Sequence, residues 1–271
     1  MEHKKITIIG AGNLGRSIAE GIVDKGVSKA QNITLTRRDL VHLSDLIQRG
    51  YKSTTNNPKA ITGADIILLC VQPSQLDEVL AEINGSLTED QLLISVITGV
   101  SIAQISSQLD KTIPVVRAMP NTAIAIGESM TCISSSNSEG LEVTTKLFNA
   151  LGKTLVIEED LMQAATVLGA SGIAFFMRYL RAATQGGVQM GFDSTDAQLI
   201  AMQTAKGAAS LVLEHHSHPE VEIDKVTTPQ GCTIEGLNEM EHKGFSSALI
   251  QGIMTSYLRI TKMKSDKEHS K

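Results

Sequence analysis

The sequence has no tryptophan, few aromatic residues of any kind and only three cysteines. Aromatic residues make up 3% of the 271 residues, while hydrophobic residues make up 42%. The core is therefore expected to be built from aliphatic residues and methionine. Cys70, Cys132 and Cys232 lie far apart, and an odd number without a C-x-x-C pair excludes a complete disulfide framework. We expect reduced thiols in a cytosolic protein.

Long basic runs and long apolar runs are also missing. The formal net charge is −5, and no basic block exceeds a few residues, which argues against nucleic acid as a main partner. The apolar run at residues 6–9 is too short for a signal peptide or a membrane span, and no other uninterrupted run approaches about 18 residues. We expect a cytoplasmic protein with neither a nucleic-acid nor a membrane partner.

Up to about residue 157, short apolar strands alternate with amphipathic helices. Continuous aliphatic strands that alternate with helices are typical of a parallel sheet covered on both faces. The predicted fold class is α/β, with an N-terminal Rossmann dinucleotide-binding domain over residues 1–158. Strands are predicted at 6–9, 33–35, 65–71, 92–97, 113–119, 129–134 and 153–158, and helices at 14–25, 74–83, 102–109 and 139–151.

From residue 159 the pattern becomes helical, with apolar residues spaced near 3.6. Helices are predicted at 161–169, 172–191, 194–216 and 244–264, and the charged stretch 264–271 is predicted to be disordered. These helices are rich in Ala, Gly, Ser and Met, so close helix contacts are expected. We predict a second, all-helical domain over residues 159–271 that completes its core against a partner chain, as a homodimer or a higher homo-oligomer.

The stretch 6-ITIIGAGNLGRSIAEGI-22 is a G-x-G-x-x-G loop between an apolar strand and a helix. Gly10 permits the tight turn, Gly12 lets the backbone approach a pyrophosphate, and Gly15 lets the helix pack closely on the strand. Asn13 and Leu14 begin the helix, whose N-terminus then faces the phosphates. The stretch predicts dinucleotide binding.

The end of the second strand favours NADPH over NADH, although NADH remains possible. An NAD site usually has an acidic residue there to hold the ribose 2′-hydroxyl, but Thr36 occupies the position and Arg37 and Arg38 follow. Two guanidiniums suit a 2′-phosphate because arginine makes charge-assisted, bidentate contacts. In the alternative, Asp39 starts the next helix and pairs with an arginine.

Two further loops follow strand ends, where ligands of open α/β sheets bind. The second, within 117-RAMPNTA-123, offers apolar atoms for a nicotinamide and an amide that can both donate and accept. A plain turn with the asparagine as its cap is the alternative. The residues expected to contact the cofactor in these loops are Val71, Gln72, Pro73, Met119, Pro120 and Asn121.

A histidine-rich stretch, 214-EHHSHPE-220, is the sequence's main candidate for a metal site. Adjacent histidines point apart on a helix, and no acidic or cysteine set completes a tetrahedral site. We interpret it as the end of a helix and expect no metal.

Late in the chain, 227-TTPQGCTIEGLNEMEHKGF-245 is a polar loop that opens a helix. With the motifs above, it makes the sequence resemble the Δ1-pyrroline-5-carboxylate reductases, which make proline. The resemblance covers nearly the whole chain. It rests on the glycine loop, V-x-P at 71–73, 95-SVITGVSI-102, R-A-M-P-N-T-A at 117–123, 186-GGVQMGF-192 and the late loop with its trailing 244-GF-245.

The resemblance implies NAD(P)H-dependent reduction of the cyclic imine 1-pyrroline-5-carboxylate to L-proline, the last step of proline biosynthesis. It also implies a helical domain that dimerises by interleaving helices, and a late loop that binds the substrate carboxylate. Thr233 is the candidate hydroxyl near the ring nitrogen and Thr228 a second, with helix capping and a plain turn as their alternatives. The implied substrate-binding residues are Ser171, Thr228, Gly231, Cys232 and Thr233.

The sequence departs from the family pattern where the site is expected. Gln72 stands for lysine, Ile173 for proline, Arg181 for glutamate and Gln230 for glycine. Gln230 puts a side chain where the backbone would approach the carboxylate. The alternatives left open are a related imine or ketone reductase of the same architecture, and a dinucleotide-binding regulator with impaired catalysis.

Overall fold

The computed structural model describes residues 1–268 and divides into two compact units. The first unit comprises residues 1–171 together with those from Tyr257 onward, and the second comprises residues 172–256. The boundary predicted between residues 158 and 159 stays a prediction.

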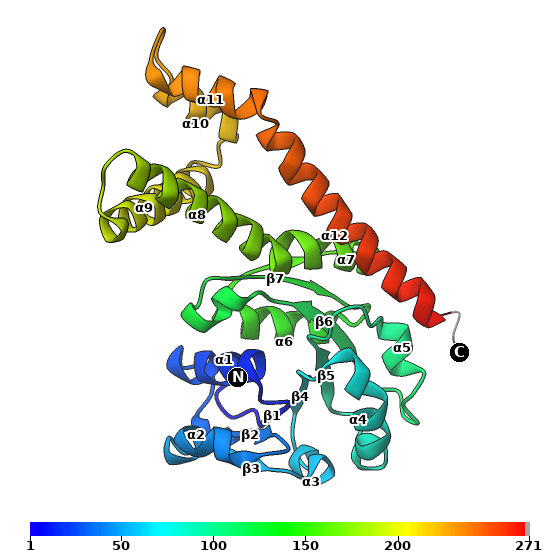
Figure 1. Ribbon diagram of the computed structural model, residues 1–271. Coiled ribbons are helices and arrows are strands. Elements are labelled where there is room, and N and C mark those ends of the chain that lie inside the picture. The colour runs from blue at the N-terminus through cyan, green and yellow to red at the C-terminus, as the bar shows by residue number, and fades with distance from the viewer. Residues whose placement is uncertain (269–271) are drawn as a thin grey trace. The chain divides into compact units, whose positions relative to one another are not determined.

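The first unit contains an eight-stranded sheet (Figure 1) with strand order β3-β2-β1-β4-β5-β6-β7-β8. Strands β1 to β6 are parallel to one another, β7 is antiparallel to β6, and β8 is parallel to β7. The strands are β1 (Ile6–Ile9), β2 (Ile33–Thr36), β3 (Lys52–Thr54), β4 (Ile66–Leu69), β5 (Leu92–Ser95), β6 (Val115–Met119), β7 (Ser129–Ser134) and β8 (Gly152–Val156).

Two features of the sheet differ from the sequence-based prediction. Strand β3 was not predicted, because it is a polar edge strand of three residues with no apolar pattern. The parallel arrangement is wrong for β7, which pairs antiparallel with β6. Only residues 120–128 connect these two strands, whereas a parallel crossover needs roughly a dozen residues or more, usually with a helix.

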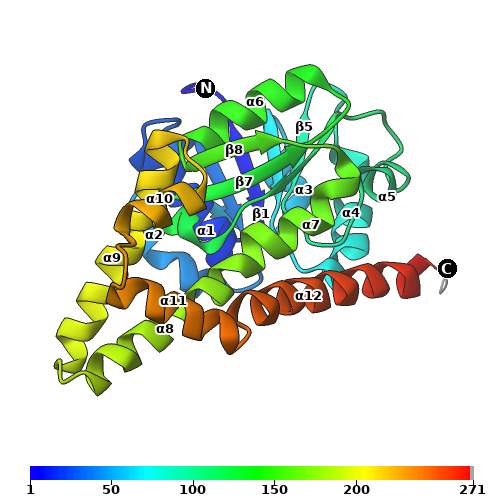
Figure 2. The same ribbon diagram turned by 90° about the horizontal axis from the view of Figure 1, so that it is seen from above.

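Helices cover both faces of the sheet, as predicted. Phe148 is the largest fully buried side chain of an otherwise mainly aliphatic core. In Figure 2, β7 and β8 lie side by side with α6 along them. One face packs against α1 (Asn13–Asp24), α2 (Ser44–Gln48) and α6 (Ser138–Asn149), and the other against α3 (Asn57–Ile61), α4 (Leu76–Ile83) and α5 (Ile102–Ser106).

The rest of the described chain is helical. Helix α10 was missed because the histidine-rich stretch was interpreted as a helix end; His218 caps α10, and Pro219 is its first residue. Helix α12 is assigned as far as Glu268, and residues 269–271 of the stretch predicted to be disordered lie outside the described residues. The elements are α7 (Met162–Ala165), a π-helical turn (Thr166–Ser171), α8 (Gly172–Gln189), α9 (Ser194–His215), α10 (Pro219–Val226), α11 (Cys232–His242) and α12 (Phe245–Glu268).

The second unit has almost no core of its own. Within residues 172–256, all of which the structure describes, the buried hydrophobic residues are Ala197 and Ala205. Gly187 packs so closely on α9 that a Cβ atom there would lie 2.8 Å from Ala197 Cβ.

The helical stretch Glu159–Gln189 is long and apolar enough to cross a membrane by length and composition alone, and 17% of its most apolar window is buried. Large side chains that are exposed include Phe176, Met177, Met190, Phe192, Leu199, Ile200, Leu213, Ile250 and Met254.

Candidate active site

The glycine loop has the geometry expected from its sequence. Gly10 has a φ of +93°, and a Cβ atom there would lie 2.7 Å from the Cys70 carbonyl oxygen. A Cβ atom on Gly15 would lie 2.5 Å from the Gly10 carbonyl oxygen. Gly12 is the N-cap of α1 without a side-chain cap, and no atom lies within 4 Å of a Cβ placed on it. The loop therefore leaves open space and unpaired backbone N–H groups at one point, the start of α1.

A cavity of about 610 Å³ lies along this loop and the carboxyl ends of β1, β2 and β4. Of the residues predicted to bind the cofactor, Gly10, Gly12, Arg37, Arg38, Val71 and Gln72 line it, and Asn13, Leu14 and Gly15 begin the adjoining helix. Pro73, Met119, Pro120 and Asn121 do not line it. Lining residues that were not predicted to bind include His42, Thr55, Asn57, Gln75, Glu78 and Glu82.

The missed residue Thr55 follows β3 directly, and Asn57 begins α3 two residues later. Because β3 was not predicted, no sequence pattern pointed to the loop after it. The rule that ligands bind beyond the carboxyl ends of parallel strands would have found both residues once that strand was known.

The two arginines differ in their contacts. Arg37 Nη1 donates to the Ala11 carbonyl oxygen at 3.0 Å, which ties its side chain to the glycine loop. Arg38 is exposed, and its Nη2 lies 3.8 Å from Glu78 Oε2 on α4. Asp39 begins a 3-10 turn, Leu40–Leu43, and accepts from the Val41 N–H at 2.9 Å. The alternative role of Asp39 as a helix start is thus correct, but the residue facing it is His42 rather than an arginine.

Asn121 is held by contacts on both sides of its amide. Its Oδ1 accepts from the Ala123 N–H at 3.1 Å, which caps a 3-10 turn, and its Nδ2 donates to the Gly169 carbonyl oxygen at 3.2 Å. In the structure Asn121 therefore caps a turn, which is the alternative interpretation given for it from the sequence. The second bond also brings the loop after β6 to the π-helical turn that ends at Ser171.

Arg117, two residues before Met119, forms an ion pair with the first residue of the helical region. Its Nη1 lies 3.1 Å from Glu159 Oε1, and the same oxygen accepts from the Ile102 N–H at 2.7 Å at the start of α5. Burial lowers the pKa of the Arg117 guanidinium, and the Glu159 carboxylate opposes this shift. Sequence reasoning did not single out this pair, because the two residues are 42 positions apart.

The late loop in the second unit is a tight turn. The Gly231 N–H donates to the Thr228 carbonyl oxygen at 3.0 Å, with Pro229 second and Gln230 third, at a φ of +57°. Gly231 is the N-cap of α11 and has no side-chain cap, so the first N–H groups of the helix are open. Thr228 is therefore the first residue of a turn, which is the alternative interpretation given for it from the sequence. Thr233 is the second residue of α11 and does not cap the helix.

The remaining departures from the family pattern, Ile173 and Arg181, lie in α8. Ser171 ends the π-helical turn, and Ile173 follows as the second residue of α8. Arg181 is exposed on α8. Cys232 is exposed at the start of α11, whereas burial raises the pKa of the Cys70 thiol to about 12.

The histidine-rich stretch contributes caps and pairs. His218 Nδ1 accepts from the Glu220 N–H at 3.2 Å, and His215 Nδ1 lies 3.5 Å from Glu222 Oε1. Among the described residues, no three His, Cys, Asp or Glu side chains are grouped so that they could hold a metal ion.

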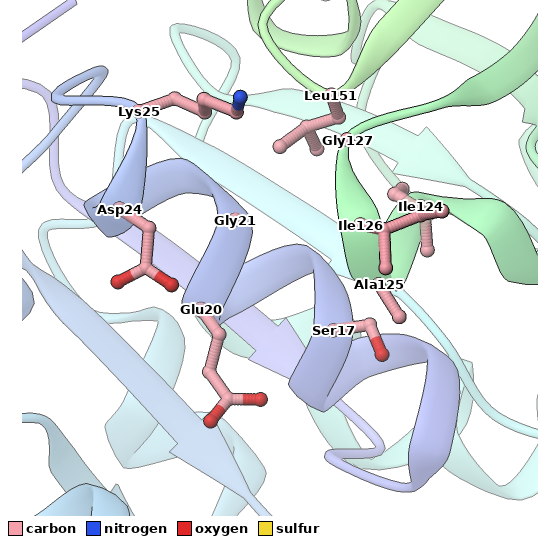
Figure 3. A pocket seen from close by; sticks show the side chains of 10 residues that line it. All are labelled: Ser17, Glu20, Gly21, Asp24, Lys25, Ile124, Ala125, Ile126, Gly127 and Leu151. Atoms are coloured by element: carbon pink, nitrogen blue, oxygen red, sulfur yellow. The ribbon is translucent and has the colours of Figure 1, made fainter.

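A second hollow, of about 390 Å³, lies between α1 and the 3-10 turn Thr122–Ile126 (Figure 3). The carboxylates that line it, Glu20 and Asp24, each lie 2.9 Å from a guanidinium nitrogen of Arg49. None of the residues predicted to bind substrate or cofactor lines this hollow. It is separate from the glycine-loop cavity.

Family models match both parts of the chain. Residues 159–263 match the model described as pyrroline-5-carboxylate reductase dimerisation. Residues 5–99 match the model described as NADP oxidoreductase, coenzyme F420-dependent. The first match assigns the exposed apolar helices to a homo-oligomer interface.

Named relatives extend the similarity over the full chain. Pyrroline-5-carboxylate reductase 2 of Dictyostelium discoideum is 44% identical over 97% of this chain and 94% of its own length. Pyrroline-5-carboxylate reductase 1 of the same organism is 49% identical over 98% of this chain, which spans about half, 51%, of that relative. The solved Plasmodium falciparum pyrroline carboxylate reductase, with NADP bound, has the same fold, with a TM-score of 0.88, 24% identity and coverage of 97% and 99% of the two chains.

The long relative shares only part of its length with this chain, but pyrroline-5-carboxylate reductase 2 is matched almost end to end. The fold is a Rossmann-type domain followed by a helical dimerisation domain. The chain belongs to the pyrroline-5-carboxylate reductase family.

Proposed function

We propose that the protein reduces 1-pyrroline-5-carboxylate to L-proline with NADPH, as the last step of proline biosynthesis. The observation that carries this proposal is the 44% identity to a pyrroline-5-carboxylate reductase over 97% of the chain, because that match spans both units. The start of the dimerisation match at residue 159 supports a Rossmann domain over residues 1–158 and a helical domain over residues 159–271. A homodimer, or a ring of dimers, is the proposed assembly.

The glycine-loop residues fit a dinucleotide. Gly12 leaves room for phosphate oxygens, and the uncapped start of α1 offers N–H donors to them. Arg37 and Arg38 are the proposed ligands of the 2′-phosphate, and both line the cavity. Val71, Gln72 and the loop Met119–Pro120–Asn121 would border the nicotinamide. The cofactor, when bound, supplies the hydride that the imine carbon receives.

The start of α11, in the second unit, is the proposed binding place of the substrate. Backbone N–H groups there favour an anion such as the substrate carboxylate, and the lack of a side chain on Gly231 lets the turn pack against Thr228. Thr233, which is not the helix cap, is free to donate its hydroxyl proton to the substrate or accept from the protonated ring nitrogen. Thr228, Cys232 and Ser171 are the other proposed substrate contacts. Positioning supplies much of the rate in such a site.

The test is NADPH oxidation by the purified protein, followed by loss of nicotinamide absorbance with and without 1-pyrroline-5-carboxylate. Imine-dependent oxidation, faster with NADPH than with NADH, is expected. Thr233→Ala should lower turnover far more than it lowers the melting temperature. NADPH binding without turnover of this imine would refute the proposed substrate.

The three cysteines carry free thiols in the structure. Free thiols are the usual state in a reducing compartment, and this supports the proposed cytoplasmic location.

A further inference from the structure

His42 lies beside the two arginines in the glycine-loop cavity. It stands on the 3-10 turn Leu40–Leu43, which is separated by Asp39 from the arginines after β2. Arg37, Arg38, Asp39 and His42 all line the cavity. The His42 Nε2 atom lies 3.7 Å from Asp39 Oδ2, so the acidic residue that follows the arginines faces an imidazole.

The carboxylates of the cavity are engaged with other groups. Glu82 accepts from Asn57 Nδ2 at 2.7 Å, and Glu78 lies 3.8 Å from Arg38. Asp39 uses one oxygen to accept from the Val41 N–H, and its other oxygen faces His42. With a neutral imidazole, the three lining carboxylates outnumber the two guanidiniums by one.

A phosphate monoester carries about −1.5 to −2 charges near neutral pH, so it binds poorly where carboxylates are in excess. A protonated imidazole removes that excess and offsets the charge of Asp39. Histidine is the side chain whose charge ordinarily changes between pH 5 and 8. A histidine that lines the cavity together with the two arginines can therefore supply a third cation.

We propose that His42 is the third cation of the 2′-phosphate subsite and makes the preference for NADPH over NADH stronger as the pH falls. The inference rests on the proposed use of NADPH. Asp39, whose Oδ2 atom lies 3.7 Å from His42 Nε2, orients the imidazole. The ligand chemistry recognised is a ribose 2′-phosphate, and NADH lacks it.

Other charged groups lie around His42 on the neighbouring elements. From α1, Arg16 Nη1 donates to the His42 carbonyl oxygen at 3.4 Å, and the same guanidinium is paired with Asp45 of α2 and with Glu20. From α4, Glu78 and Glu82 face the cavity. The remaining titrating group is the 2′-phosphate itself, whose ionisation strengthens binding as the pH rises, opposite to His42.

The test compares the wild type with His42→Gln, so that ionisation of the phosphate cancels. Dissociation constants of NADPH, NADH and adenosine 2′,5′-bisphosphate are measured on the full chain at pH 6.0 and pH 8.5 and at constant ionic strength, by calorimetry or nucleotide fluorescence. At pH 6.0 the substitution should weaken the binding of NADPH and of the bisphosphate about threefold to fivefold, and at pH 8.5 by less than about twofold. NADH should be unaffected at both values. His3→Gln, at an exposed histidine outside the cavity, is the matched control.

A second variant should bind NADPH more tightly than the wild type, which a misfolded protein could not do. Asp39→Asn keeps an oxygen for the Val41 N–H but removes the charge, so NADPH should bind about twofold to fivefold more tightly at pH 8.5, with NADH unchanged.

Equal weakening of NADPH and NADH in His42→Gln, or the same weakening at both pH values, would overturn the proposal. Nucleotide binding is measured without imine. A wild type that does not turn over 1-pyrroline-5-carboxylate would therefore refute the proposed substrate, but the ratios of dissociation constants between the wild type and His42→Gln would stay valid. A wild type that binds no NADPH would overturn both.

Discussion

At the scale of single residues, the glycines of the nucleotide loop serve different purposes. A Cβ on Gly15 would meet the Gly10 carbonyl oxygen at 2.5 Å, which no rotamer change can relieve because the neighbour is backbone. A Cβ on Gly12 would meet nothing within 4 Å. Gly15 is therefore required for the packing of the turn. At Gly12 the lack of a side chain leaves room for the phosphates of the dinucleotide.

Alanine substitutions should separate these two requirements. Gly15→Ala is expected to destabilise the protein by about 1–3 kcal/mol, because the turn must move. Gly12→Ala should cost less than about 1 kcal/mol, yet weaken NADPH at least about tenfold, because its methyl group would stand against the phosphates. Thermal melts without nucleotide and NADPH titrations measure the two effects. Equal losses of stability in the two variants would contradict this assignment.

Gln230 carries backbone strain that the family's glycine would not. Proline at the second position of a turn and a positive φ at the third are the features of a type II turn, in which glycine is the favoured third residue. Gln230 adopts a φ of +57° and still makes the turn bond from Gly231 to Thr228. The loop thus keeps its conformation despite the substitution.

Gln230→Gly is expected to stabilise the folded chain by up to about 1 kcal/mol, the relieved strain being partly offset by the greater freedom of glycine when unfolded. Gln230→Ala is the matched control, since it removes the same side chain but keeps the strained φ. Urea unfolding at fixed protein concentration gives both values. A larger gain in the alanine variant would show that the side chain, rather than the backbone, carries the cost.

At the scale of elements, the Arg117–Glu159 pair joins β6, α5 and the start of the helical region. The Arg117 side chain is 6% exposed, and Glu159 also accepts from the first N–H of α5. A guanidinium in such a place needs its partner, because an unpaired buried charge is far less stable than a buried pair.

Glu159→Ala should therefore lower the free energy of unfolding by about 3–5 kcal/mol. Glu159→Gln should cost less, because its amide oxygen can still accept from Arg117 and Ile102. Glu142→Ala, which breaks the exposed pair between Glu142 and Lys146, should cost about 0.5 kcal/mol or less. Chemical denaturation of the three variants tests this order, and a Glu159→Ala loss as small as that of Glu142→Ala would disprove it.

At the scale of the whole molecule, the helical region depends on a second chain. Residues 172–256 bury little apolar surface within one chain, and the family model matched there describes dimerisation. The apolar stretch Glu159–Gln189, whose composition alone would also allow a membrane span, begins at the same residue as the dimerisation match. Burial against another subunit supplies the core that these helices lack.

A charge on this surface should disrupt the assembly. Ile200→Glu, on α9, is expected to shift the protein to monomers and to lower its melting temperature, because a carboxylate would be buried in an apolar interface. Ile47→Glu, on α2, is the control, since the two isoleucines are similarly exposed, at 49% and 43%. Sedimentation of both variants gives the result. Dissociation by both, or by neither, would contradict the assigned interface.

Local patterns in the sequence were enough to predict the glycine loop and most of the strands around it. The glycine loop could be recognised from its strand, its glycines and its helix, because these follow one another within a short stretch of the chain. The same holds for the aliphatic strands, whose apolar runs are long enough to be recognised. The turn at Thr228–Gly231 could also be expected from its proline and glycine.

Other features were decided only by contacts between distant segments. Strand β3 is too short and polar to be recognised, so Thr55 and Asn57 were missed, and the direction of β7 depends on a connection too short for a crossover. Arg117 faces Glu159, which lies 42 positions later in the chain, because the fold brings β6 and the start of the helical region together. The sequence by itself determined the two-part architecture, the nucleotide loop and the family, since these depend on local periodicity and motifs. The tertiary structure decided which charges share a cavity, because charge pairing depends on distance in space and not along the chain.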